Sequence, residues 1–235
     1  LAFGTAQAAE QPIIGLITKT ESNPFFVKMK EGAEAEAAKL GAKILSGAGK
    51  MDGDNAGQVT AMENMIAAGA KTILITPSDA KAIIPAIKKA QRQGVQVIAL
   101  DSPTDPASAV DALFATNNYT AGVLIGQYAK SALGGKKPVI ATLDLFPGHP
   151  VGAQRHNGFL QGFGSKSLPA ESNELAMPGE VVCSADTTAT PLKVRPRWKT
   201  ACRRTPTSTS FTRSMSPPLQ VHTMRSKQPV KRRVL

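Results

Sequence analysis

With 235 residues, of which 42% are hydrophobic, the chain can form one large domain or two small ones and can bury a core. It contains no run of about 18 apolar residues, so no membrane-spanning helix is expected, and its two cysteines cannot define a disulfide framework. The net charge of +11 is typical of a nucleic-acid binder, but it is not spread over the chain. Residues 187–235 hold 12 of the 28 Lys and Arg and none of the 17 Asp and Glu, so the rest of the chain has a net charge of −1. The same segment has none of the 20 Gly.

The N-terminal stretch "LAFGTAQAAEQP" does not begin with Met, and Ala6-Gln7-Ala8 has the small-x-small pattern of a signal-peptidase site. We therefore interpret residues 1–9 as the remnant of an export signal. The alternative is a small, polar terminus without such a role.

Short apolar runs of strand length alternate with segments of helical period between residues 12 and 164. The expected strands are 12–18, 42–47, 72–77, 95–100, 111–116 and 137–145. The expected helices are 24–41, 55–70, 79–94, 118–133 and 151–164. This alternation predicts an α/β fold, a parallel sheet flanked by helices on both faces.

The first expected helix has clear end signals. Asn23 is a good N-cap, Pro24 suits the first helical position and Gly41 suits the end. Apolar residues recur at intervals of three and four. They are Phe26, Met29, Ala33, Ala37 and Leu40.

In such a sheet, ligands bind beyond the carboxyl ends of the strands. The loops at that edge are 18–23, 76–79, 101–106, 116–118 and 144–150. The stretch "GGKKP" at 134–138 is a plausible domain boundary, with about four strand–helix units before it and at least one after it.

The first of these loops, "TKTESNPFF", combines Lys19, Asn23, Phe25 and Phe26. Two aromatic rings can stack on the C–H faces of a sugar while Asn and Lys bond to its hydroxyls. The alternatives are that Asn23 only caps the helix and that Phe26 belongs to the core. Phe25 lies off the periodic apolar face, which favours a binding role.

Three later positions offer further polar contacts. Asp101 ends an apolar strand, where a carboxylate can accept hydrogen bonds from two adjacent hydroxyls of a ligand. The alternative is that Asp101 caps a helix or forms a turn. One of Asn117 and Asn118 is expected to cap the following helix. Arg155 lies in the first turns of a helix and suits a multidentate contact with oxygens, unless it is a solvated surface residue.

Signals for catalysis are absent from the sequence. The three His have no metal-ligand spacing, no Ser lies in a nucleophile elbow, and no Gly-rich loop matches a phosphate cradle. The sequence therefore predicts a binding protein, not an enzyme, with no cofactor and no metal.

Four segments in order, "ITKTESNPFFVKMKEGAEAEAAKLGA", "VIALDSP", "FATNNYTAGVLIGQYA" and "PGHPVGAQRHNGF", resemble the type I periplasmic sugar-binding proteins. These are substrate-binding subunits of ribose/galactose-type ABC importers, and the chain is most similar to the fructose/ribose/mannose branch. The resemblance covers roughly residues 13–186. It implies a periplasmic-binding-protein-like fold of two α/β domains, and a periplasmic monomer that carries a monosaccharide in the interdomain cleft to a membrane permease.

The resemblance also implies roles for single residues. Asn23 and the Phe25/Phe26 pair match the family's first-loop polar contact and stacking aromatics, and Lys19 lies where a polar contact is usual. Asp101 matches the acid that holds two sugar hydroxyls. Ser102 follows it where many members have a basic or amide residue. The implied sugar contacts are Lys19, Asn23, Phe25, Phe26, Asp101, Ser102, Asn118 and Arg155, while Val151, where galactose-type members carry Asp, argues against galactose-type specificity.

The basic C-terminal segment does not resemble the family in its own reading frame. Residues 195–202 and 211–218 can be back-translated with suitable synonymous codons, and the resulting DNA can be read from one base earlier. In that frame the first stretch encodes "QTAMENC" and the second encodes "VYTINEPA". The first repeats the "TAMEN" of 60–64, and the second supplies a "TINEP"-like loop that family members carry. We therefore interpret the segment as an out-of-frame translation after a single-base loss near Thr187, which leaves the form impaired.

Two alternatives remain. A genuine Lys/Arg-, Ser/Thr- and Pro-rich tail on a ligand-sensing α/β protein would attract nucleic acid or anionic surfaces, although it lacks the aromatic interleaving of specific single-strand binders. A sugar-responsive repressor core is disfavoured because no helix-turn-helix precedes Ile13. The expected parts are therefore the export remnant (1–9), a complete N-terminal sugar-binding domain (10–134), the start of an incomplete second domain (135–186) and a disordered basic tail (187–235), with no specific nucleic-acid partner.

Overall fold

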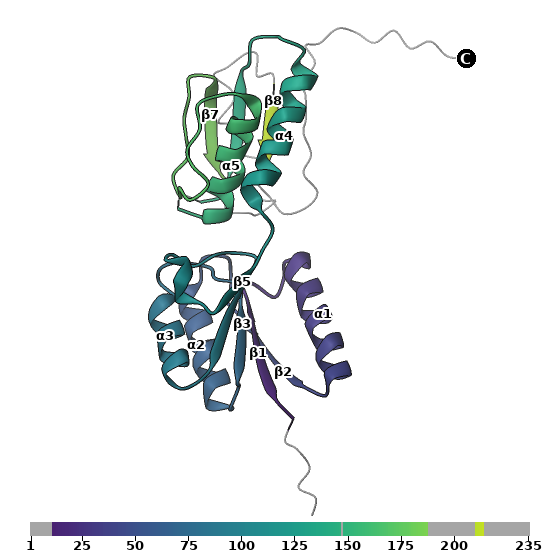
Figure 1. Cartoon of the computed structure of the whole chain (residues 1–235), viewed down its shortest axis with the longest axis vertical. Helices are drawn as coiled ribbons and strands as arrows, with labels where there is room; N and C mark the ends of the chain where they lie inside the picture. Colours follow the sequence, from purple (N-terminus) through teal and green to yellow (C-terminus); the bar gives the residue numbers. More distant parts are fainter. Residues whose placement is uncertain (1–10, 147, 188–209, 214–235) are drawn as a thin grey trace, which may run out of the picture. The chain divides into compact units, whose positions relative to one another are not determined.

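The computed structural model describes residues 11–146 and 148–187 and the backbone of 210–213. The chain divides into two compact units, Leu1–Ala115 and Thr116–Leu235 (Figure 1). No described helix is both long and apolar enough to cross a membrane. The predicted export remnant lies outside the described residues.

The first unit is built on a five-stranded sheet in the order β2-β1-β3-β4-β5, and all its neighbouring strands are parallel. Its strands are β1 (Ile13–Thr18), β2 (Lys43–Ala48), β3 (Thr72–Ile75), β4 (Gln96–Leu100) and β5 (Ala112–Phe114). Its helices are α1 (Pro24–Leu40), α2 (Asn55–Ala67), α3 (Ile84–Arg92) and the short 3₁₀ turn η1 (Ala107–Ala109). The predicted parallel α/β fold is confirmed.

The helices cover both faces of this sheet: α2 and α3 lie on one side and α1 on the other (Figure 1). Alternate residues of the strands, such as Ile73 and Ile75 of β3, are fully buried in a core shared with α2 and α3. Met62 and Met65 of α2 complete this core. The period-2 alternation of the strands therefore decides which side chains meet the two helices.

Helix α1 begins and ends where the sequence predicts. The side chain of Asn23 accepts a hydrogen bond from Phe25 N, Pro24 is the first residue, and Gly41 adopts the left-handed conformation at φ 68°. The predicted apolar face is only partly correct. Phe26 and Ala37 are buried, but Leu40 is 71% exposed because it is the last residue before the chain turns through Gly41.

Helix α3 begins later than the prediction of residue 79, at Ile84. The Asp79 side chain accepts hydrogen bonds from the backbone N–H groups of Lys81 and Ala82, which holds the preceding segment in turns. Pro85 then occupies the first turn, where its missing N–H costs nothing; a helix from residue 79 would have placed it in the interior.

The second unit has a three-stranded parallel sheet in the order β7-β6-β8, formed by β6 (Ile140–Asp144), β7 (Val181–Asp186) and β8 (Ser210–Arg213). Its helices are α4 (Asn118–Leu133) and α5 (Pro150–Phe163). They pack very closely: a Cβ on Gly126 would meet backbone atoms of Phe159 and Phe163. This contact makes α4 part of the second unit, so the division falls one helix before the boundary predicted at residue 134.

The structure describes two parts of the segment 187–235. Thr187 is buried and donates its hydroxyl and backbone N–H to the carbonyl of Asp144. The backbone of Ser210–Arg213 pairs with β6 as β8. Backbone pairing with an open strand edge makes few demands on side-chain identity, which explains a strand in a segment without family resemblance. The other residues of the predicted tail lie outside the described part of the chain.

Candidate functional site

The carboxyl ends of the parallel strands bring several loops of the first unit to one edge of its sheet. Lys19 follows β1, Asp52 lies between β2 and α2, and Asp101 follows β4. All three side chains interact electrostatically, which shows that these loops converge although their residues are far apart in the sequence.

Lys19 is only 3% exposed. Burial lowers the pKa of its ammonium group, while the carboxylates of Asp52 and Asp101 act in the opposite direction. A buried lysine is costly unless its charge is paired, and these carboxylates offset part of that cost.

Asp101 has a backbone conformation unusual for a residue other than glycine, with φ at 63°. Its N–H donates to the carbonyl of Phe114 in β5, and its carboxylate accepts a hydrogen bond from the hydroxyl of Ser102 at 3.3 Å. Ser102 is 2% exposed. The structure thus brings the predicted contacts Lys19, Asp101 and Ser102 together at one edge.

The loop from β1 to α1 serves the helix start. Asn23 is exposed and uses its side-chain oxygen to cap α1, while its own N–H donates to the hydroxyl of Thr20. Phe25 is half-buried and Phe26 is buried, and their rings meet edge to face with centroids 5.2 Å apart. The capping alternative for Asn23 is therefore realised, and Phe26 is placed as a core residue would be.

Two predicted contacts meet in the second unit. The Nε of Arg155 donates to the side-chain oxygen of Asn118 at 2.8 Å, and the amide of Asn118 donates to the carbonyl of Thr116 at 3.1 Å. Asn117 is the cap of α4, as expected of one of the two asparagines. The guanidinium of Arg155 is therefore anchored at the start of α4, not freely solvated.

The sequence did not lead us to predict a role for Gln58. This fully buried α2 residue donates its amide to the carbonyls of Thr18 and Thr76 and accepts from the N–H of Ser78. It therefore ties together the carboxyl ends of β1 and β3. A signal existed, since Gln58 precedes Met62 and Met65 at helical spacing, which places a polar group on the buried face of α2.

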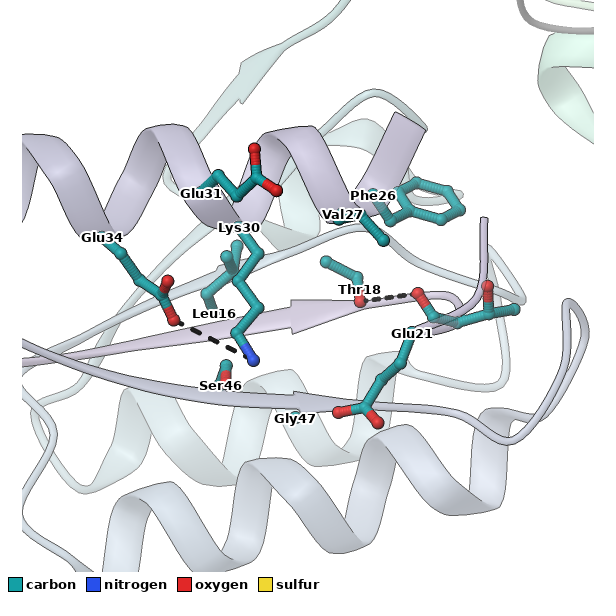
Figure 2. Close-up of a pocket in the computed structure, with 11 residues that line it drawn as sticks. Leu16, Thr18, Glu21, Phe26, Val27, Lys30, Glu31, Glu34, Ser46 and Gly47 are labelled. Carbon is teal, nitrogen blue, oxygen red and sulfur yellow. Dashed lines mark hydrogen bonds and ion pairs between the residues drawn. The ribbon is translucent and has the colours of Figure 1, made fainter. Parts of the chain in front are cut away.

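A cavity of about 300 Å³ lies between α1 and the strands β1 and β2 (Figure 2). Its lining includes Leu16 of β1, Ser46 of β2 and the Lys30–Glu34 ion pair of α1 at 3.9 Å. Among the residues predicted to bind sugar, Phe26 alone lines it. The cavity therefore does not coincide with the group around Lys19 and Asp101.

Among the described residues no group of three or more His, Cys, Asp and Glu could hold a metal ion. Parallel α/β units that gather buried polar side chains at the carboxyl edge of a sheet are typical of proteins that bind small molecules. This is the class that the fold and the arrangement of these residues define.

Comparison with known proteins names the family. A family model described as "Periplasmic binding protein domain" matches residues 14–193, and the chain belongs to this family. It is 34% identical over 146 residues to the ribose import binding protein RbsB of Bacillus subtilis (62% of this chain, 47% of that protein). It is 32% identical over 160 residues to RbsB of Escherichia coli (67% and 52%). The chain spans about half the length of these curated relatives.

Among solved structures, a periplasmic solute-binding protein of an ABC transporter from Actinobacillus succinogenes, with bound D-allose, superposes with a TM-score of 0.73 at 26% identity. The match covers 87% of this chain and 69% of that one. The predicted resemblance to periplasmic sugar-binding proteins is thereby confirmed, and the family is one of solute-binding, non-catalytic domains.

Proposed function

We propose that the chain is the sugar-binding component of an ABC importer, which captures a monosaccharide of the ribose class in the periplasm and delivers it to a membrane permease. The names of the similar proteins support this, because they are ribose import binding proteins and a D-allose-bound solute-binding protein. The non-catalytic family supports a carrier role, in which the sugar leaves unchanged.

The observation that carries this proposal is the environment of Asp101. Its left-handed backbone is held by the hydrogen bond to Phe114 of the neighbouring strand, next to the buried Lys19 and Ser102. Such strained conformations are retained at binding sites, where the surrounding structure fixes them. A carboxylate held in this way can accept two adjacent hydroxyls of a sugar, a pattern that apolar or singly hydroxylated molecules do not offer.

The second unit supports the same function. Anchoring by Asn118 pre-organises Arg155, so that less side-chain freedom is lost when the guanidinium meets sugar oxygens. In this proposal Phe25 supplies the stacking ring, since it is half-buried and in edge-to-face contact with Phe26. Asn23 contributes through the amide of a side chain whose oxygen already caps α1.

The test is an NMR-detected titration of the 235-residue chain with D-ribose, D-allose and D-fructose, a method that also registers weak binding. We expect saturable shifts of the amide resonances near Lys19 and Asp101. Asp101→Asn should weaken binding at least about tenfold, because a buried hydrogen bond to a charged group is lost. Asp105→Asn is the matched control, since the side chain of Asp105 forms an exposed ion pair with Lys81, a kind of contact that contributes little. If none of the sugars shifts any resonance, the proposed function is wrong.

A further inference from the structure

Asp52 is not among the residues predicted to contact sugar, yet it interacts electrostatically with two of those residues, Lys19 and Asp101. It lies in the loop that joins β2 to α2, next to the strand that carries Lys19. Lys19 and Asp101 both act on its carboxylate. Three loops, after β1, β2 and β4, therefore place one ammonium and two carboxylates at the same edge of the sheet.

One carboxylate oxygen of Asp52 has no hydrogen-bond donor in the described part of the chain. Its Oδ1 is buried and accepts no hydrogen bond from the described residues, while the backbone N–H of Gly53 bonds to the carboxylate. A buried carboxylate oxygen without a donor is costly, and native structures rarely keep one without a reason. Burial raises the pKa of Asp52 and lowers that of Lys19, so the protein surroundings oppose the charge on both groups.

Asp54, two residues further on, shows what a purely structural carboxylate looks like in this loop. It caps α2 by accepting from the N–H of Gly57, and it also accepts from the N–H of Lys50. The backbone of the loop thus uses both oxygens of Asp54 but leaves Oδ1 of Asp52 without a donor among the described residues.

We propose that Asp52 is a further ligand contact, and that with Lys19 and Asp101 it selects neutral polyhydroxylated ligands over anionic ones. This inference rests on the proposed function. Hydroxyls of a sugar can donate to Oδ1 of Asp52 and to the carboxylate of Asp101, and can accept from Lys19, so one molecule can contact all three groups. A sugar acid would bring its carboxylate toward two fixed carboxylates and a single ammonium, and like charges at close range are strongly unfavourable.

The experiment compares D-ribose with D-ribonate, an anion with the same number of carbons, by NMR-detected titration of the full 235-residue chain. The variants are Asp52→Asn, which keeps the size of the side chain and removes its charge, and Asp52→Ser, which serves if the first variant unfolds. Asp54→Asn is the matched control, because it makes the same charge change in the same loop and keeps the oxygen that caps α2, although it gives up the second hydrogen bond, from the N–H of Lys50.

We expect the wild-type chain to prefer ribose over ribonate, and Asp52→Asn to reduce this preference at least about tenfold, the effect of about one lost charge contact. Asp54→Asn should change it less than about twofold, because the carboxylate of Asp54 accepts from the N–H groups of Lys50 and Gly57 and is not among the charges that act on Lys19. An unchanged preference in both Asp52 variants, with ribose still bound by the wild type, overturns this inference and leaves the proposed function intact. A wild-type chain that binds neither compound overturns both.

Discussion

Asp101 combines an unfavourable backbone conformation with a proposed sugar contact. Among the described residues it is the one non-glycine with positive φ, a region that costs a side chain about 1–3 kcal/mol unless the surroundings compensate. The hydrogen bond to Phe114 O and the hydroxyl of Ser102 hold it there. The same constraint fixes the direction of the carboxylate.

Two substitutions of Asp101 separate the effect of its backbone conformation on stability from the effect of its carboxylate on sugar binding. Asp101→Gly should leave the free energy of unfolding within about 1 kcal/mol of the wild type, because glycine accepts positive φ at no steric cost. Asp101→Val should lower it by about 1–3 kcal/mol, because a β-branched residue does not. Both should lose sugar binding. Urea unfolding and sugar titration measure the two quantities, and equal stabilities of the Gly and Val variants would contradict the strain argument.

His156, in the second unit, is a buried polar side chain whose two ring nitrogens both have partners. Its Nε2 lies 2.7 Å from the carbonyl of Ala176, which only accepts, and its Nδ1 lies 2.9 Å from Asp144 Oδ1. The other oxygen of Asp144 accepts from the hydroxyls of Thr142 and Ser184. Both ring nitrogens therefore need a proton. Burial acts to lower the pKa of His156, but the hydrogen bonds and charge of Asp144 and the Ala176 carbonyl outweigh it and raise the pKa.

This raised pKa predicts a pH dependence of stability. The folded-state pKa lies above the unfolded value of about 6.5, so the contribution of His156 is fully present below that pH and is lost as the pH rises through the folded pKa. Thermal unfolding of the full chain should therefore shift to lower temperature as the pH is raised from about 6 through this range. His156→Gln should remove this shift. A wild-type chain that becomes more stable over the same range would refute the prediction.

At the scale of elements, α4 and α5 pack against each other through glycines. Gly122 and Gly126 of α4 face Gly158 and Gly162 of α5, and a Cβ on any of them would collide with backbone atoms of the other helix. Glycine weakens each helix by itself, by about 0.5–1 kcal/mol per residue relative to alanine. The close approach that it permits lets the backbones of the two helices pack directly against each other.

Alanine substitutions test this directly. Gly126→Ala should lower the free energy of unfolding by at least about 1–3 kcal/mol, because backbone atoms of α5 cannot yield as a flexible side chain would. The matched control is Gly32→Ala in α1, where an added Cβ meets nothing within 4 Å. That variant should be as stable as the wild type or more stable by about 0.4–1 kcal/mol. Chemical unfolding measures both, and similar effects of the two substitutions would exclude helix contact as the cause.

For the molecule as a whole, the sequence determines most of the fold and less of the site. Strand–helix alternation and the caps at Asn23 and Gly41 are local signals, so the parallel sheet and α1 were predictable. The start of α3 depended on the turn at Asp79, and the unit boundary depended on the α4–α5 contact, neither of which follows from periodicity. Asp52 could not be found, because only the folded sheet brings its loop to Lys19.

The origin of residues 187–235 remains a prediction at this scale. The segment has neither an acidic residue nor any of the 20 glycines, a composition that a change of reading frame explains without selection for a partner. Strand β8 includes the first three residues of the stretch 211–218, which the neighbouring frame reads as "VYTINEPA". Val, Tyr and Thr in that frame, like Phe211 and Thr212 in this one, are residue types favoured in strands, so the strand is compatible with both frames.

The measurement is the sequence of the coding DNA across codons 180 to 195 and past the stop codon. We expect a missing base near codon 187, followed in the neighbouring frame by more sequence of the binding-protein family. Restoring that frame should then raise the sugar affinity by orders of magnitude, because each additional buried polar contact contributes about 1–3 kcal/mol. A clean frame with nothing family-like downstream would instead make the basic segment part of the protein. Its affinity for polyanions, measured at two salt concentrations, would then explain the charge of +12 that the rest of the chain does not share.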